Sequence, residues 1–281
     1  MAIIEVDHIT HRFGEKTVLR GIDLTVEKGE LVGLLGPSGA GKTTLINLMT
    51  GQMKPSEGCV RIQGKVLEKS GQVPAGTGIM MDRFGLYERL SVWENLRLFA
   101  RINGVTENRI IELLDRTELL EAKNTAVAKL SKGMRCRVNF CRALLKPIDI
   151  LYLDEPTSGL DPVTTRKIHQ LILEEKSHGT TIFLTTHNMY EAETLCDRVM
   201  LLNQGKIVEQ GTPEQICNRY NHLNVLRVLL KDGTEHTLPN AGESAGAVRE
   251  WLEQEQIRSI HSSEPNLENV FLDITGRRLE G

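Results

Sequence analysis

Hydrophobic and polar residues follow two different periods along this chain of 281 residues. Mainly apolar runs at 31–35, 79–81 and 148–153 and a β-branched run at 180–186 are typical of buried strands. Apolar residues at helical spacing follow three of these runs. Strands that alternate with helices predict an α/β fold with a mainly parallel sheet covered on both faces.

The remaining pattern divides the chain into parts. Residues 1 to about 30 alternate as short antiparallel strands do, which makes the expected sheet structure mixed. The segment from about 85 to 147 is mainly helical and predicts a helical insert. The end of the chain shows a hairpin, a helix, a strand and a last helix, a pattern that predicts a small α+β unit. We therefore expect a large domain at 1–219 and an accessory domain at 220–281.

Composition narrows the class of protein. Hydrophobic residues at 40% and charged residues at 25% are ordinary for a soluble globular chain. The net charge of −3 provides no basic field for nucleic acid, and the longest apolar runs are too short to span a membrane. The start lacks the basic and apolar regions of a signal peptide. Five scattered cysteines without a C-x-x-C pair indicate reduced thiols in a cytosol-like compartment and argue against zinc.

A phosphate-binding loop follows the strand at 31–35. Its glycines let successive backbone N–H groups point at a triphosphate, and the next helix directs its positive end there. Lys42 supplies a charge for the β- and γ-phosphates, and the Thr43 hydroxyl is placed to bind Mg²⁺. The motif G-x-x-x-x-G-K-[ST] comprises Gly36, Pro37, Ser38, Gly39, Ala40, Gly41, Lys42 and Thr43, with Thr44 next.

Acidic residues end the strand at 148–153. We expect Asp154 to reach the Mg²⁺ beside Thr43, and Glu155 to act as the general base for an attacking water. The alternative is an exposed acidic turn. His187 follows another strand and is placed to reach the γ-phosphate, since ligands bind at the carboxyl ends of such strands.

Three further residues, Ser131, Gly133 and Phe13, each have a functional and a structural interpretation. Ser131 and Gly133 open a helix and form an anion site, although taken alone they fit an ordinary N-cap. Because the chain already has one phosphate cradle, a second one indicates ATP shared between two copies. Phe13 is the only aromatic residue of the first 30; its ring stacks on adenine or packs in the core or a hairpin.

In this order the motifs resemble those of the ATP-binding cassette (ABC) ATPases, over about residues 1 to 215. The resemblance implies that two copies close head to tail over two ATP molecules. Ser131 and Gly133 then contact the γ-phosphate held by the partner's Lys42, Asp161 lies across the dimer interface, and Phe13 stacks on adenine. The matching segments are Gly36 to Thr43, Leu130 to Met134, Ile150 to Glu155, Gly159 to Asp161, and His187.

The tail resembles one branch of that family. Residues 265–272, with Thr275 and Gly276, are similar to the ending of bacterial ABC-2-type drug- and antibiotic-export ATPases of the daunorubicin-resistance and bacitracin-resistance types. The resemblance implies an ATP-hydrolysing subunit that drives export of a drug-, antibiotic- or lipid-like substrate. It would form a homodimer bound to separate transmembrane permease subunits at the cytoplasmic face of the membrane, with ATP and Mg²⁺ as cofactors and no nucleic acid partner.

Two departures from the family pattern stand out. In the segment Leu130 to Met134, which corresponds to the family's signature, Lys132 and Met134 stand where the commonest form has Gly and Gln. Ser131 and Gly133 are kept. Asp82 replaces a glutamine at the end of the strand that leads to the membrane-facing loop. An aspartate can bind Mg²⁺ but cannot donate a hydrogen bond at neutral pH. We hypothesise that Asp82 keeps the metal role and changes the coupling to hydrolysis.

Rival functions remain open at this point. A soluble ABC-type ATPase of ribosomes or DNA usually has two cassettes in one chain or long coiled-coil insertions, and this chain has one phosphate loop. A binding subunit without hydrolysis is disfavoured by the Asp154-Glu155 pair but not by Asp82. An importer subunit is disfavoured by the tail.

Overall fold

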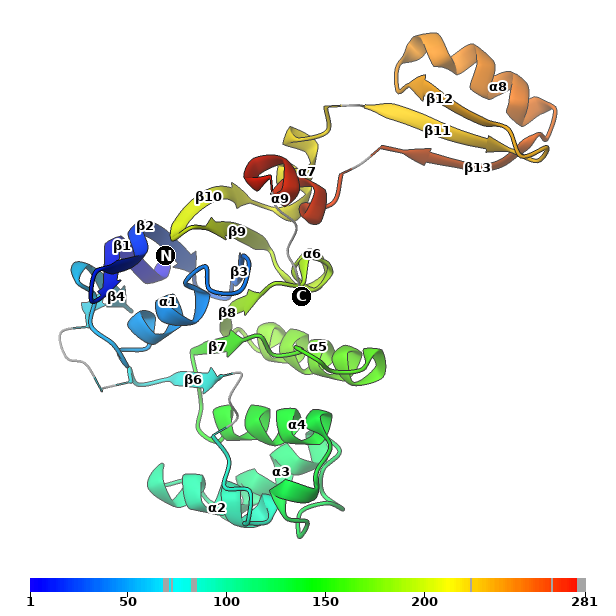
Figure 1. Ribbon diagram of the computed structural model, residues 1–281. Coiled ribbons are helices and arrows are strands. Elements are labelled where there is room, and N and C mark those ends of the chain that lie inside the picture. The colour runs from blue at the N-terminus through cyan, green and yellow to red at the C-terminus, as the bar shows by residue number, and fades with distance from the viewer. Residues whose placement is uncertain (68–70, 72, 82–84, 223, 264, 277–281) are drawn as a thin grey trace. The chain divides into compact units, whose positions relative to one another are not determined.

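The chain forms two compact units in the computed structural model (Figure 1). The structure describes residues 1–67, 71, 73–81, 85–222, 224–263 and 265–276. The first unit extends from Met1 to Gln210, and the second begins at Gly211. This division comes earlier than the expected boundary at 219/220, because α7 (Pro213–Arg219) packs against α9 (Leu267–Thr275) near the end of the chain.

An antiparallel sheet of four strands, in the order β2-β1-β4-β5, opens the first unit. Its first two strands are longer than the short strands expected from the sequence. Alternate side chains of β2 are buried, as expected of a strand with one covered face. The strands are β1 (Ala2–Phe13), β2 (Lys16–Glu27), β4 (Glu57–Ile62) and β5 (Lys65–Val66).

A second sheet has six strands in the order β10-β9-β3-β8-β7-β6. The neighbours from β9 to β6 pair in parallel. Every residue of β3, β7 and β8 is buried, which explains their continuous apolar or β-branched sequences. The strands are β3 (Leu31–Leu35), β6 (Thr77–Met80), β7 (Ile150–Asp154), β8 (Thr181–Thr186), β9 (Arg198–Asn203) and β10 (Lys206–Gly211).

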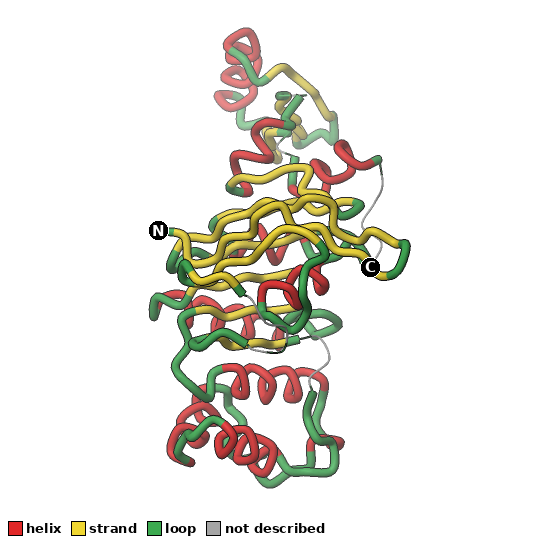
Figure 2. The backbone as a smooth tube through the Cα atoms, turned by 90° about the vertical axis from the view of Figure 1, so that its left-hand side faces the viewer, coloured by secondary structure: helices red, strands yellow, loops and turns green. Residues whose placement is uncertain are grey.

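The main core of the first unit combines side chains of both sheets with those of α1 (Lys42–Met49), which contacts β4 and β7. α6 (Met189–Leu195) contacts β3 and β8. α5 (Pro162–Ser177) has Asp161 as its N-cap and Pro162 as its first residue. Figure 2 shows the strands of this unit gathered in one region and the helices of the insert in another.

Three helices form the insert: α2 (Val92–Ile102), α3 (Glu107–Arg116) and α4 (Lys132–Ala143). They contact one another, and α4 also contacts β6 of the six-stranded sheet. α2 begins with a capping box in which Ser91 and Glu94 satisfy each other's backbone N–H groups. The helical insert at 85–147 therefore follows the predicted pattern.

The second unit contains a three-stranded sheet in the order β12-β11-β13. The strands are β11 (Val225–Leu230), β12 (Glu235–Pro239) and β13 (Ile257–Ser262), and the antiparallel β11–β12 pair is the predicted hairpin. On α8 (Ala245–Glu253), Trp251 stacks on His236 of β12, with ring centroids 4.6 Å apart. Across the described residues of both units, no helix is long and apolar enough to cross a membrane.

Candidate functional site

Three neighbouring strands bring the phosphate loop, Asp154, Glu155 and His187 to one edge of the six-stranded sheet. β8 lies between β3 and β7 and runs parallel to both, so the carboxyl ends of all three meet there. β3 leads into the phosphate loop, β7 ends at Asp154, and β8 ends just before His187. Open α/β sheets bind ligands at this edge.

The backbone of the phosphate loop requires glycine at two positions. Gly41 has a φ of +113°, a conformation that residues with a side chain rarely adopt. A Cβ atom on Gly36 would lie 2.3 Å from the carbonyl oxygen of Leu202 on β9. The loop then enters α1, whose first N–H groups have no acceptor within the helix and can bind an anion. The loop therefore fits a phosphate.

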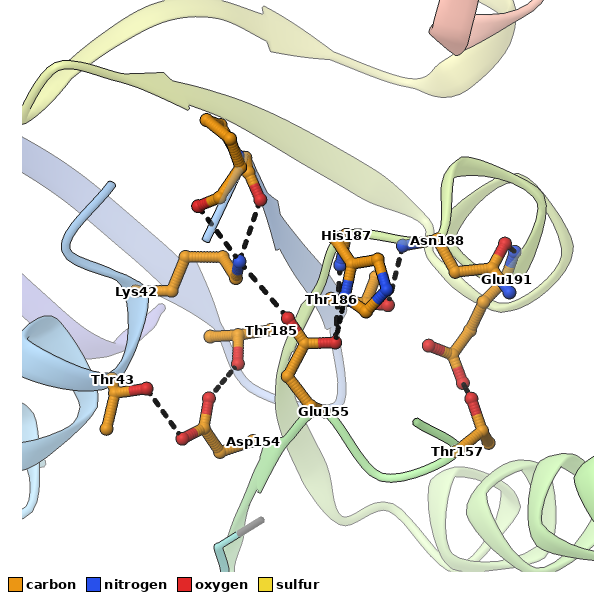
Figure 3. Close-up of polar contacts among 12 residues, drawn as sticks. Lys42, Thr43, Asp154, Glu155, Thr157, Thr185, Thr186, His187, Asn188 and Glu191 are labelled. Carbon is orange, nitrogen blue, oxygen red and sulfur yellow. Dashed lines mark hydrogen bonds and ion pairs between the residues drawn. The ribbon is translucent and has the colours of Figure 1, made fainter. Parts of the chain in front are cut away.

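Lys42 extends back along this loop (Figure 3). Its Nζ atom donates to the carbonyl oxygens of Gly36, at 2.7 Å, and Pro37, at 3.3 Å. The same atom lies 3.1 Å from Oε1 of Glu155. The lysine is buried, so its charge is held beside the phosphate loop by groups that an anionic ligand can replace.

The hydroxyl groups of two threonines point at the Asp154 carboxylate (Figure 3). Its Oδ2 atom accepts a hydrogen bond from Oγ1 of Thr43 at 2.8 Å, and its Oδ1 atom accepts one from Oγ1 of Thr185. Carboxylate and hydroxyl oxygens are the ligands that Mg²⁺ prefers, so the set fits this metal. Thr43 and Asp154 are thus brought together as expected, whereas the third predicted ligand, Asp82, lies outside the described residues.

Glu155 contacts both of the other predicted catalytic residues, Lys42 and His187 (Figure 3). Besides its contact with Lys42, its Oε2 atom lies 2.7 Å from Nδ1 of His187. The backbone φ of Glu155 is +50°, a left-handed value that is uncommon for a residue with a side chain. Such strained conformations cluster at functional sites. The geometry excludes the alternative of a simple exposed acidic turn, because the side chain is mostly buried and paired.

Ser131 and Gly133, which belong to the signature segment Leu130 to Met134, lie at the start of α4. Ser131 is the N-cap of α4 and accepts a hydrogen bond from the backbone N–H of Met134. A Cβ atom on Gly133 would lie 2.6 Å from the side chain of Thr164, and the Thr164 hydroxyl donates to Asp161 at 2.6 Å. This hydrogen bond is the first cause that lowers the pKa of the exposed Asp161 carboxyl. The start of α4 and the start of α5 therefore lie together.

Phe13 is at the end of β1, next to the turn that leads to β2. Its side chain is half exposed, at 51%, and contacts the ring of His11 edge to face at 4.8 Å. The interpretation of Phe13 as a core aromatic is therefore wrong, and its place is at a hairpin. An exposed ring can stack on a base, so the adenine role stays a prediction.

Sequence reasoning missed Thr185, which contacts Asp154. The two residues are directly opposite in the register of β7 and β8. The only signal in the sequence was the β-branched run at 180–186, and that run does not say which strand lies beside it. Thr157, in the loop after β7, and Glu191, on α6, were also missed, since no local pattern shows that these two segments are in contact; their side chains pair at 2.7 Å.

Known proteins share these motifs and this fold. The ABC transporter family model matches residues 19–158. A fluoroquinolones export ATP-binding protein of Mycobacterium tuberculosis is 36% identical, over 99% of this chain and 94% of its own. The linearmycin resistance ATP-binding protein of Bacillus subtilis is 30% identical over 99% of both chains. A dimeric ATP-binding cassette solved in a post-hydrolysis state with ADP and Pi bound has a TM-score of 0.67 at 27% identity, over 74% of this chain and 98% of its own.

The fold and the site define a nucleotide-binding cassette with a phosphate loop. The chain belongs to the ABC transporter family and is one of its ATP-binding proteins. The predicted fold class and the resemblance to ABC ATPases are confirmed.

Proposed function

We propose that this chain hydrolyses ATP to drive export through separate membrane subunits. One observation carries the proposal: Glu155 lies within 3.1 Å of Lys42 and 2.7 Å of His187, beside a phosphate loop. A general base, a phosphate-binding cation and a polar group for the γ-phosphate are the parts that hydrolysis of a phosphoanhydride requires.

Each of these side chains has a separate task in the reaction. Lys42 binds the β- and γ-phosphate oxygens and offsets their charge. Glu155 takes a proton from the attacking water as the water oxygen bonds to the γ-phosphorus and the bond to the ADP oxygen breaks. His187 donates to the γ-phosphate, which holds the group that is transferred. For this to happen, ATP and water replace the contacts that Glu155 now makes with Lys42 and His187.

Thr43 and Asp154 are the residues that would hold Mg²⁺. When bound, Mg²⁺ neutralises phosphate charge and orients the phosphates. Thr185 fixes the orientation of the Asp154 carboxylate through the hydrogen bond between them.

Two copies would share each nucleotide. Ser131 and Gly133 open α4 with a hydroxyl group and the first N–H groups of the helix, which suits a γ-phosphate held by the partner copy. Asp161 opens α5 beside them and would lie at the dimer interface. The dimeric state of the cassette solved with ADP and Pi supports this arrangement.

Export of a drug-, antibiotic- or lipid-like substrate is proposed from the relatives, whose names refer to fluoroquinolones export and linearmycin resistance. Their sequences match this chain over nearly its whole length, including the C-terminal unit. The chain would act at the cytoplasmic face of the membrane, bound to permease subunits.

Steady-state ATP hydrolysis by the purified protein, with and without Mg²⁺, tests the enzymatic half of the proposal. We expect phosphate release that stops when EDTA removes the metal and that is lost in Lys42→Ala. Hydrolysis that persists in Lys42→Ala would contradict it.

Capture of the tagged protein from detergent-solubilised membranes, followed by mass spectrometry, tests the export half. A polytopic membrane protein in about equal amount is the expected result. Ribosomal proteins, or no membrane protein at all, would overturn the export assignment and leave the ATPase chemistry in place.

A further inference from the structure

A buried hydrogen bond between Thr157 and Glu191, here called the bridge, lies to the right of the contact between Glu155 and His187 in Figure 3. Its centre is Glu191 on α6, a glutamate with no exposed surface. The Glu191 Oε1 atom accepts a hydrogen bond from Oγ1 of Thr157 at 2.7 Å and lies 3.1 Å from Nε2 of His169 on α5.

A carboxylate in this position is costly to bury, because charged groups lose their hydration inside a protein. The carboxylate nevertheless has a hydroxyl and an imidazole as its only polar side-chain partners in the described part of the chain. Its Oε2 atom has no hydrogen-bond partner among the described residues. An apolar side chain would pack here without that cost, so stability alone gives a poor account of Glu191.

The bridge connects the two segments that carry the catalytic pair. Thr157 is two residues after Glu155, and Glu191 is four residues after His187. Both segments directly follow the paired strands β7 and β8. Beyond the strands, their side chains are joined by the Glu155–His187 contact at the surface of the site and by the buried Thr157–Glu191 hydrogen bond.

The Glu155–His187 contact has to open during hydrolysis, whereas the Thr157–Glu191 hydrogen bond can stay closed. Glu155 must leave His187 to accept a proton from water, so their contact cannot hold the segments together at the moment of reaction. The Thr157–Glu191 bond is closed to solvent, since the two residues are 7% and 0% exposed, and nothing in the reaction requires it to open. His169 is on α5, whose N-cap Asp161 lies beside the start of α4, so the same carboxylate also contacts the helix next to Ser131 and Gly133.

We propose that Glu191 is a positioning residue for ATP hydrolysis. Through Thr157 it keeps the Glu155 and His187 segments in register while the contact between those two residues opens and closes. This inference rests on the proposed ATPase function.

Replacement of the Thr157 hydroxyl tests the bridge without changing the shape of the residue. Thr157→Val removes the donor, and we expect a fall in kcat of about tenfold with KM for ATP within about twofold, because the loss concerns only the reacting arrangement. Thr157→Ser keeps the hydroxyl and should retain at least about a third of the wild-type kcat.

Thr181→Val is the matched control. Thr181 is also a fully buried threonine, its hydroxyl accepts a hydrogen bond from the backbone N–H of Gly29, and it lies at the opposite end of β8 from the site. We expect this variant to lose thermal stability but keep the wild-type kcat.

A double-mutant cycle identifies the partner. Glu191→Gln added to Thr157→Val should lower kcat by clearly less than the product of the two single effects, because both changes act on one bond. Fully multiplicative effects would contradict a shared role.

The outcomes separate this inference from the proposed function. The positioning role is wrong if the kcat of Thr157→Val equals that of the wild type, or is no lower than that of Thr181→Val, while Glu155→Gln is inactive. The proposed ATPase function would stand in that case. If the wild-type protein shows no turnover that depends on Glu155, the proposed function fails and the positioning role fails with it.

Discussion

The Nδ1 atom of His187 lies 2.7 Å from Oε2 of Glu155; the two residues are 32 positions apart in the sequence, and each directly follows one of the adjacent parallel strands β8 and β7. The other carboxylate oxygen of Glu155 faces Lys42. One side chain thus holds the cation of the phosphate loop and the histidine together. A site built in this way depends on the carboxylate more than on any other group.

Replacement of Glu155 by glutamine should therefore abolish most turnover while the site still binds ATP. The amide has the shape of the carboxylate but cannot accept a proton, and loss of a general base typically costs about 10²- to 10⁴-fold in rate. We expect kcat to fall by at least about 100-fold and ATP affinity, measured with a fluorescent analogue, to stay within about threefold.

Glu174→Gln is the control for that variant, since Glu174 pairs with Arg116 through an ion pair at 3.2 Å, away from the phosphate loop. Its kcat should match that of the wild type. Turnover retained in Glu155→Gln would mean that another group is the base.

Phe13→Ala should weaken ATP binding, because the adenine base loses the ring on which it stacks. Contacts to the phosphates should not change. Stacking of a base on an aromatic ring is worth about 1–3 kcal/mol, which predicts a rise in KM of about tenfold. Phe13→Trp should restore it. Inhibition by tripolyphosphate, which has no base, should be the same in wild type and Phe13→Ala; a parallel loss of tripolyphosphate binding would refute the stacking role.

Tyr152→Phe should stabilise the fold. The Tyr152 hydroxyl on β7 is buried and has no hydrogen-bond partner among the described residues, and burial raises the pKa of the phenol. Removal of an unsatisfied buried polar group should add about 1 kcal/mol to the free energy of unfolding. The neighbouring Phe183 provides the reverse change: Phe183→Tyr should lower stability. Urea denaturation measures both, and a less stable Tyr152→Phe would show that the hydroxyl is satisfied after all.

Thiol reagents should distinguish the cysteines of the folded protein. Burial raises the pKa of Cys136 to about 12 and that of Cys141 to about 11, so at pH 8 only about one thiol in a thousand or fewer is a reactive thiolate there. Burial also raises the pKa of Cys196. We expect iodoacetamide to label Cys59 and Cys217, which are partly exposed, well before these three.

The unfolded chain in urea is the control, and all five cysteines should react there. Because a raised pKa disfavours the thiolate, labelling of Cys136 in the folded protein should rise only as the pH approaches 12. Rapid labelling of Cys136 at pH 8 would show that its segment opens.

Local signals in the sequence were sufficient for most elements of the first unit. The glycine pattern of the loop, the apolar run of β3 and the acidic end of β7 each depend on short-range backbone and burial requirements, so they can be read from adjacent residues. α7 was not predicted, although Thr212 and Gln215 form a capping box at its start, because the helix is only seven residues long.

The sequence by itself determined the candidate residues for binding phosphate and metal, and the order in which they follow strands, because both depend on adjacent residues. Only the tertiary structure decided that Thr185 contacts Asp154, that Thr157 contacts Glu191, and that the ring of Phe13 is exposed. The reason is physical: which strands are neighbours, and in which register, follows from the packing of the whole core, and no short segment contains that information.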